Sequence, residues 1–280
     1  MTHLESNRTY ARPRPTIAGL SAKILPTLIV AGLLALVPAG ILVASEPTAG
    51  EIIDKYVEAT GGAEAYGKID NRVVKGTLDL GAQGITLGMT IFAAKPNKNY
   101  TLIESDATGK MERGTDGEVV WEVSAMMGPQ IKEGQERADY LREASFDRWT
   151  HWRDIYEKAD YEGVETVDDA PAHKIVLTPK DGKAQTYYFD QASNLVVKVE
   201  FVLENPMGTI PLVSYLGDYK EVDGLLIPHS ARIVVMSQER VMTTTSVEHN
   251  VDLPEDRFAL PAEIRALVEE SEGDSAAESD

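Results

Sequence analysis

The chain has 280 residues with an ordinary hydrophobic content of 43%, but it is strongly acidic, with a formal net charge of −18. Such a surface repels phosphate backbones, which excludes nucleic acid as an expected partner. The chain has no cysteine. This absence excludes disulfides, thiolate metal sites, cysteine nucleophiles and the acylated N-terminal cysteine of a lipoprotein.

Residues 1–45 have the pattern of an export segment. The basic residues of this segment end at Lys23, and the run 24–44 contains no charge. Small residues at 43–45 fit a cleavage site, so we predict a signal peptide cleaved before Glu46. An uncleaved membrane anchor is the alternative, because the apolar run is long. In both cases the distribution of basic residues predicts that the remaining chain lies in the periplasm, either free or tethered to the inner membrane and facing the periplasm.

Two short helices are expected at the start of the mature chain. Thr48 and Glu51 fit a capping box, and apolar residues at 52, 53, 56 and 57 follow at helical spacing. Gly61-Gly62 ends this helix, and a second helix is expected through Tyr66.

From Val73 to Val251 the apolar period changes to two, which predicts β-strands. The alternating apolar residues at 85, 87, 89 and 91 are one example, and those from 195 to 203 are another. Asp-Gly pairs at 116–117, 181–182 and 223–224 lie between such runs, as in hairpin turns. We predict ten to twelve strands, mostly paired with antiparallel neighbours.

Two segments depart from this pattern. The aromatic residues of 133–156 recur mostly at steps of three and four, which predicts a helical insertion. After Pro261 the chain is acidic and poor in apolar residues, which predicts a disordered tail over 262–280. The β-rich domain therefore spans 46–261.

The helical segments are small compared with the apolar face of so many strands. We predict a mainly β fold with a few helices: a large curved antiparallel sheet, a half-open β-barrel, whose concave face the helices cover. A partly filled interior would form an apolar cavity of the kind that holds lipids. The alternative is a completely packed core without a ligand.

Several segments together support a family resemblance: EIIDKYVEATGGAEAYGKI, RVVKGTLDL, GTDGEVVWEVSAMMGPQ, YYFDQASNLVVKVE and YLGDYKEVDGLLIPHSARI. The chain resembles the outer-membrane lipoprotein-sorting family, in the superfamily of the lipoprotein carriers LolA and LolB. The resemblance implies a half-open barrel that holds an apolar ligand, such as lipid or lipoprotein acyl chains. It leaves open whether Arg72 or Arg113 corresponds to the carriers' latch arginine. Envelope-stress sensing domains share this fold and bind lipid or an envelope protein, which makes an interaction domain the alternative function.

The candidate ligand-binding residues are aromatic residues and methionines of one strand, the turn after it and the helical insertion: Trp121, Met126, Met127, Tyr140, Phe146, Trp149 and Trp152. Methionines next to an apolar strand suit an adaptable mouth, and aromatic side chains on a helix suit a lid. For each group, ordinary core packing is the alternative.

No sequence pattern indicates catalysis. Histidines lack metal-ligand spacing, and His173 and His249 share the parity of apolar strand residues, so we expect no metal and no cofactor. Among 45 acidic residues some pair always looks suited to acid–base work, so a hydrolase is the least favoured alternative. We expect an exported protein of the bacterial envelope that binds or carries hydrophobic ligands and is not an enzyme.

Overall fold

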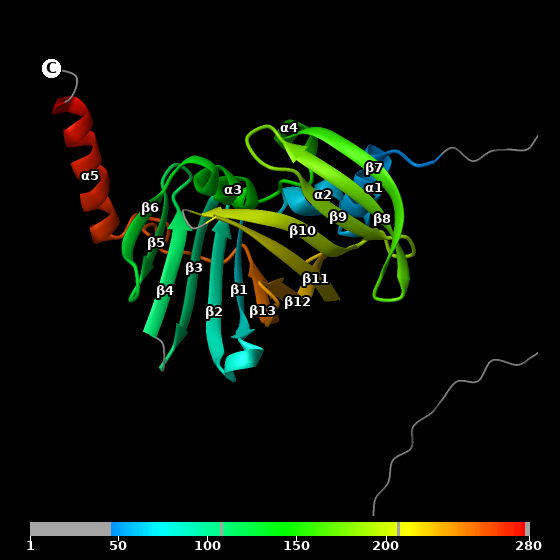
Figure 1. Ribbon diagram of the computed structural model, residues 1–280, viewed down its shortest axis with the longest axis horizontal. Coiled ribbons are helices and arrows are strands. Elements are labelled where there is room, and N and C mark those ends of the chain that lie inside the picture. Colours follow the sequence, from blue (N-terminus) through cyan, green and yellow to red (C-terminus); the bar gives the residue numbers. More distant parts are fainter. Residues whose placement is uncertain (1–45, 107–108, 206–207, 278–280) are drawn as a thin grey trace, which may run out of the picture. The chain divides into compact units, whose positions relative to one another are not determined.

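The computed structural model describes residues 46–106, 109–205 and 208–277 (Figure 1). Within these residues, thirteen strands form one antiparallel sheet with the order β6-β5-β4-β3-β2-β1-β13-β12-β11-β10-β9-β8-β7. The strands are β1 (Asn71–Asp79), β2 (Thr86–Ala94), β3 (Lys98–Ser105), β4 (Gly109–Thr115), β5 (Val120–Ser124), β6 (Gly128–Lys132), β7 (Tyr156–Val167), β8 (Ala170–Pro179), β9 (Gln185–Asp190), β10 (Val196–Asn205), β11 (Gly208–Val222), β12 (Leu225–Val235) and β13 (Gln238–His249). The helices are α1 (Ala49–Ala59), α2 (Gly62–Gly67), α3 (Gly134–Ala144), α4 (Trp152–Ile155) and α5 (Ala262–Ala277), with a 3₁₀ turn, η1, at Gly81–Gln83.

The predicted fold class is confirmed: the protein is mainly β, and the sheet is large, antiparallel and not closed. The described chain has one strand more than the highest number expected. β6 is a strand that the sequence pattern does not mark, since its five residues include Pro129 and show little apolar alternation. Proline is tolerated there because β6 is an edge strand with one side free of ladder hydrogen bonds.

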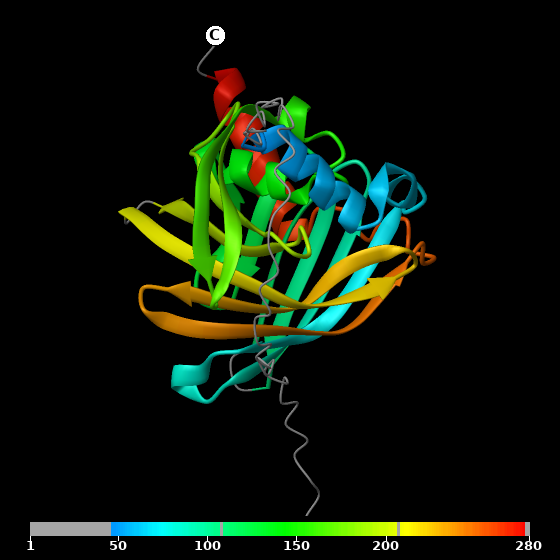
Figure 2. The ribbon, with the colours of Figure 1, turned by 90° about the vertical axis from the view of Figure 1, so that its right-hand side faces the viewer.

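The sheet curls around the helices (Figure 2). α3 contacts both β5, near one edge of the sheet, and β10, in its other half. We call the side of the sheet that faces α1, α3 and α4 the concave face, and the other side the convex face.

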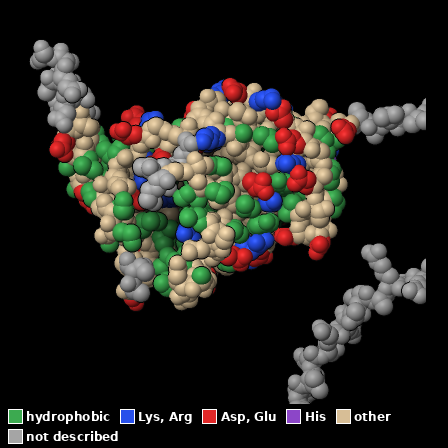
Figure 3. Space-filling view, in the orientation of Figure 1, with side chains coloured by type: hydrophobic (Ala, Val, Ile, Leu, Met, Phe, Trp, Pro, Cys, Tyr) green, Lys and Arg blue, Asp and Glu red, His purple; other side chains and the backbone are tan. Residues whose placement is uncertain are grey.

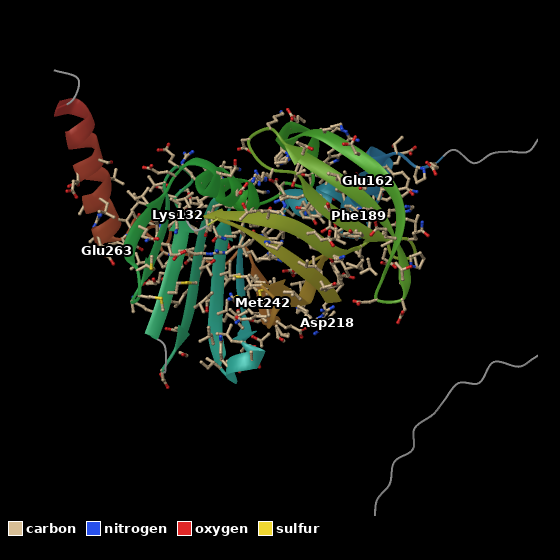
Figure 4. The ribbon with its side chains drawn as sticks, in the orientation of Figure 1. Lys132, Glu162, Phe189, Asp218, Met242 and Glu263 are labelled. Carbon is tan, nitrogen blue, oxygen red and sulfur yellow. The ribbon has the colours of Figure 1, made fainter. Side chains whose placement is uncertain are left out.

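α1 fills one end of the concave face. Its capping box is present as predicted, with the Thr48 hydroxyl accepting from the Glu51 amide at 3.2 Å. Ile52 and Ile53, on its inner side, are 1% and 0% exposed. They belong to one core cluster with buried residues of β8 and β9, including Phe189, which Figure 4 labels. The apolar spacing of this helix therefore predicted its buried side correctly.

The helical insertion is shorter than the aromatic spacing predicted. α3 ends at Ala144, and the backbone of Ser145 is no longer helical, with φ −58° and ψ 111°. The Phe146 amide then donates to the carbonyl of Pro96, in the β2–β3 connection, at 3.0 Å. This tertiary contact replaces the helical hydrogen bond, so turns separate α3 from the single turn of α4.

The segment after β13 crosses the convex face. The amide of Val251 donates to the Asn71 side chain at 2.9 Å, and the Arg257 guanidinium lies 4.5 Å from the ring centre of Phe92. The chain after Pro261, where the composition predicts a disordered acidic tail, is helix α5 in the structure. Its first turn is anchored, because Ile264 is 0% exposed and α5 contacts β6. Figure 4 labels Lys132 and Glu263, which mark the end of β6 and the start of α5.

The predicted export segment, 1–45, lies outside the described residues. Among the residues that the structure describes, none of the helices is both long and apolar enough to span a membrane.

Candidate ligand-binding surface

A continuous apolar surface covers the part of the concave face that α1 does not fill. Strand register assigns its members to one face, because directly paired residues of neighbouring strands share a side. We call this surface the open floor, and its residues are Val74, Leu78, Ile91, Ile103, Met111, Phe201, Leu212, Ile233, Val235, Met242 and Val247.

Every residue of the open floor is partly exposed, although Leu87, Met89 and Ala231, which lie between them on the same face, are buried. Under α1 the same face is closed, with Ile175, Leu177 and Phe189 each 0% exposed. Figure 3 shows hydrophobic side chains around a hollow over β2–β4, beside β10 and β11. Figure 4 labels Met242 of the open floor, well apart from Phe189 in the core under α1. An apolar surface of this extent without a covering element is typical of a binding site.

At least three arginines lie on this concave face: Arg72, Arg113 and Arg240, which pairs with the floor residue Ile233 near the rim. Arg72 is next but one to Val74 on β1, and its guanidinium lies 5.4 Å from the ring centre of Phe146. Arg113, on β4, lies 5.2 Å from the ring centre of Tyr140, and it is exposed. These contacts join the floor to the segment that contains α3 and the turns after it.

Arg72 is part of a short hydrogen-bonded chain. Its Nε donates to Nε2 of His249 at 2.9 Å, and Nδ1 of His249 lies 2.9 Å from a carboxylate oxygen of Asp223. This pattern requires His249 to carry its proton on Nδ1 and to donate it to Asp223. Burial and the nearby charge of Arg72 lower the pKa of His249, although Asp223 opposes the shift. His249 is therefore neutral at pH 7.

Of the predicted ligand-binding residues, Tyr140 lies against Arg113 and Phe146 lies against Arg72. The Tyr140 hydroxyl also donates to Oδ1 of Asn99, a neighbour of the floor on β3, at 2.8 Å. Both side chains are partly exposed and border the open floor from the helical side.

Trp149 and Trp152 lie farther along, in the core around α1. The ring of Trp149 meets Tyr56 edge-on at 5.1 Å and Tyr187 at 5.2 Å. Trp152 is 8% exposed and donates from its indole nitrogen to Asp54 at 3.2 Å. These contacts are those of packing residues, while a role for either residue in a lid stays a prediction.

Trp121 lies on the convex face. It pairs with Gly114, which pairs with Tyr100, and the rings of Trp121 and Tyr100 are 6.0 Å apart. Arg113, adjacent to Gly114 in sequence, contacts Tyr140 on the concave face. Because successive residues of a strand point to opposite sides, Trp121 and Tyr140 are separated by the sheet. The structure therefore does not bring Trp121 together with the other aromatic candidates.

Met126 and Met127 form the turn between β5 and β6 and are 91% and 62% exposed. The alternating strand directions place this turn at the same end of the sheet as the β12–β13 turn, where Met236 is 72% exposed. The last floor residues of β1 and β13, Leu78 and Met242, lie near this end. The exposed methionines are thus rim residues rather than part of the floor.

Two cavities lie away from the open floor. One, of about 920 Å³, is lined by residues at the tips of β2, β3 and β4, including Gly88, Glu104 and Lys110, which face the convex side. The other, of about 410 Å³, lies beside Trp152 and the start of α1. Both have mixed polar linings, so neither matches the chemistry of an acyl chain as well as the floor does.

The floor residues themselves were not selected from the sequence, although their alternation was visible. On β2 the expected face is correct, since Leu87, Met89 and Ile91 all face the concave side. On β10 a bulge between Val196 and Lys198 changes the parity, so that Val197 packs on the convex side with Tyr188. A bulge cannot be read from period-two alternation.

The described residues contain no group of three or more His, Asp or Glu side chains placed to hold a metal ion. His173, which shares the apolar parity, instead accepts or donates a hydrogen bond with the Tyr161 hydroxyl at 3.1 Å.

Comparison with known proteins identifies solved structures with a similar fold. No protein-family model matches the chain, and no curated protein matches it in sequence. Among solved structures, the fold is that of the lipoprotein-sorting and LolA type of domain, so the predicted resemblance is confirmed at the level of fold.

Three solved structures illustrate the similarity. A domain from Vibrio parahaemolyticus described as an outer-membrane lipoprotein-sorting protein domain has a TM-score of 0.51 and 14% identity, over 75% of this chain and 95% of that one. A LolA superfamily protein from Nitrosomonas europaea has a TM-score of 0.52 and 14% identity, over 76% and 98%. A DUF1329 family protein from Desulfovibrio piger has a TM-score of 0.53 and 14% identity, over 75% and 97%. At such identity the comparison establishes the fold alone.

Proposed function

We propose that the domain binds hydrophobic ligands, such as lipid or lipoprotein acyl chains, on the open floor and carries them in the bacterial envelope. The observation that carries the proposal is the contrast within one concave face, which is closed under α1 and partly exposed across the open floor. Each ligand methylene that leaves water there contributes about 0.8 kcal/mol.

The similar structures support the proposal in one respect. One of them is described as a lipoprotein-sorting domain and another as a LolA superfamily protein, and both are similar to this chain in fold. A carrier requires a surface and a rim rather than a catalytic group, and we assign no residue of this chain a catalytic role. We also propose an envelope location, with the described domain exported by residues 1–45.

The direct test compares two neighbouring residues on opposite faces of β13. Met242 lies on the floor, and Thr243 is exposed on the convex face. Met242→Asp should weaken binding of a fluorescent fatty-acid analogue by at least about tenfold, which corresponds to about 1.4 kcal/mol. Thr243→Asp should leave binding unchanged.

Mass spectrometry of lipids that co-purify with the exported protein provides an independent measurement. Recovery of apolar ligands with the natural protein but not with Met242→Asp would support a carrier. A protein that emerges empty and binds no analogue would instead favour the envelope interaction domain, for which a partner protein is the expected ligand.

The proposed location has its own test. N-terminal sequencing of protein from its native host should begin near Glu46 if the segment before it is cleaved. Recovery of residues 1–45 in a membrane fraction would replace cleavage by anchoring, and recovery from the cytoplasm would contradict both.

A further inference from the structure

Three of the four described arginines of the helical segment have carboxylate partners, whereas Arg137 donates from Nε to the backbone carbonyl of Glu118 at 3.1 Å. Arg142 pairs with Asp139 and Asp181, and Arg148 pairs with Glu143. Arg153 holds Asp54 through two hydrogen bonds, of 3.0 and 2.7 Å. Although burial acts against the charge, these carboxylates raise the pKa of Arg142, Arg148 and Arg153.

Arg72 differs from these arginines. Among the described residues, no carboxylate forms an ion pair with it; its contacts are the neutral His249 and the ring of Phe146. Burial lowers the pKa of Arg72, the opposite of the direction for the arginines that have carboxylate partners. The side chain nevertheless keeps its charge at any physiological pH. A desolvated cation without a counter-ion is costly, and such a cation is stabilised by any anion that reaches it.

Within the described part of the chain, the ionisable groups whose charge acts on Arg72 are the hydroxyls of Tyr66 and Tyr56. Burial raises the pKa of both hydroxyls, so they stay neutral. The Asp223 carboxylate is reached only through the His249 ring, whose two nitrogens are both engaged. His249 also fixes the guanidinium by accepting from Nε, and no described residue accepts a hydrogen bond from its two terminal nitrogens, which remain as donors for a ligand.

Arg72 lies at one end of the open floor. It is on the same face of β1 as Val74 and Leu78, and the paired rows of β2 and β13 continue this surface toward the rim. The six steps along the strand from Arg72 to Leu78 span about 20 Å at about 3.3 Å per residue. The cationic side chain of Arg72 therefore lies at the inner end of the open floor.

We infer that the ligand is an anionic single-chain amphiphile, with its carboxylate or phosphate head group bound at Arg72 and its acyl chain lying along the open floor. The inference rests on the proposed function and names its ligand class. An apolar ligand without a charged head would leave Arg72 without a counter-ion. An anion with two or three acceptor oxygens suits the planar donor pattern of a guanidinium.

The test uses the whole exported protein and three probes with the same acyl chain: a long-chain fatty acid, the corresponding monoacyl phosphate and the fatty acid methyl ester. Calorimetric titration should show at least one of the two anionic probes binding about tenfold or more tighter than the ester, as expected for a charged hydrogen bond. The tighter of the two anions identifies the head group.

Arg72→Gln should reduce the preference for the anionic probe to about twofold or less, while leaving affinity for the ester nearly unchanged. Arg72→Lys should keep part of the preference, because the charge remains but the planar donor pattern is lost. Arg113→Gln is the matched control: it removes an exposed arginine on the same face and should leave the preference intact.

Equal binding of all three probes to the natural protein would overturn the head-group assignment while leaving hydrophobic binding in place. Binding of none of them would contradict the proposed function itself. If Arg72→Gln does not fold, the comparison of probes on the natural protein still decides the matter. A purely structural Arg72 predicts that Arg72→Gln weakens acid and ester equally, which would also overturn the inference.

Discussion

The concave face has two regions that differ in cover rather than in composition. Under α1, aromatic and aliphatic residues of β8 and β9 are completely buried, and Phe189 is 0% exposed. On β10 and beyond, residues of the same kind, such as Phe201, remain partly exposed. The exposure of an apolar strand residue on this face therefore depends on which element covers it.

The largest expected effect separates these two regions directly. Phe189→Ala should lower the free energy of unfolding by about 3–5 kcal/mol, because it removes a buried ring and leaves a cavity. Phe201→Ala, on the same face one strand away, should cost no more than about half as much, since its ring is already partly in water. Urea unfolding measures both.

Ligand binding should reverse this order, with Phe201→Ala weakening binding of an acyl probe more than Phe189→Ala in protein that is still folded. Equal losses of stability would show that the floor is packed as tightly as the core under α1. In that case the fully packed alternative would be correct.

A second comparison concerns the convex side, where the chain after β13 supplies the cover. Ile264→Ala should cost about 2–4 kcal/mol, because this side chain is fully buried at the start of α5. Arg265→Ala, one residue on and exposed, should stay within about 0.5 kcal/mol. If both changes were neutral by thermal unfolding, α5 would be dispensable, as a disordered tail would be.

The rim of the open region gives a smaller effect, on binding rather than on stability. Met127→Asp should weaken binding of an acyl probe by about tenfold, or about 1.4 kcal/mol, if ligands pass this turn. Its melting temperature should stay close to that of the natural protein, because the side chain is 62% exposed.

Val164→Asp is the control for the rim, since Val164 is 49% exposed on the edge strand β7, outside the floor. It should leave both binding and stability unchanged. Should Met127→Asp behave in the same way as this control, the rim methionines would have no part in ligand entry.

The smallest effect is a pH dependence at the junction of the two regions. The folded pKa of His249 is lowered from its ordinary value of 6.5 by burial and by Arg72, and burial also lowers that of His173. Below about pH 6.5 these two histidines therefore bind protons more readily in the unfolded chain than in the folded chain. Stability should fall with decreasing pH, by at most about 1.4 kcal/mol per pH unit for each histidine.

His249→Gln should flatten this slope, measured by urea unfolding at pH 7.5, 6.5 and 5.5, and leave the part due to His173. An unchanged slope would mean that His249 titrates alike in the folded and unfolded chain. The pKa of some carboxylates, such as Asp54 and Glu112, is also lowered from the ordinary values of 3.8 and 4.5. Their protonation therefore reduces stability mainly at lower pH than that of the histidines.

Local chemistry in the sequence predicts the elements of this protein well. A capping box starts α1, and the Asp223-Gly224 pair forms the β11–β12 turn with both residues at positive φ, 50° and 81°. Alternation predicts most strands. These features depend on residues a few positions apart, so the sequence contains all the information that determines them.

Tertiary structure decides which side of each strand is inside and how far it is covered. Period-two alternation distinguishes two faces but does not say which face a helix covers, which is why Trp121 lies opposite the other aromatic candidates. Likewise Arg72 is one arginine among many in the sequence. Only the folding of β1 against β13 and the segment after α3 buries it beside His249 and Phe146, with no carboxylate of the described chain paired to it, because these contacts join residues far apart in the chain.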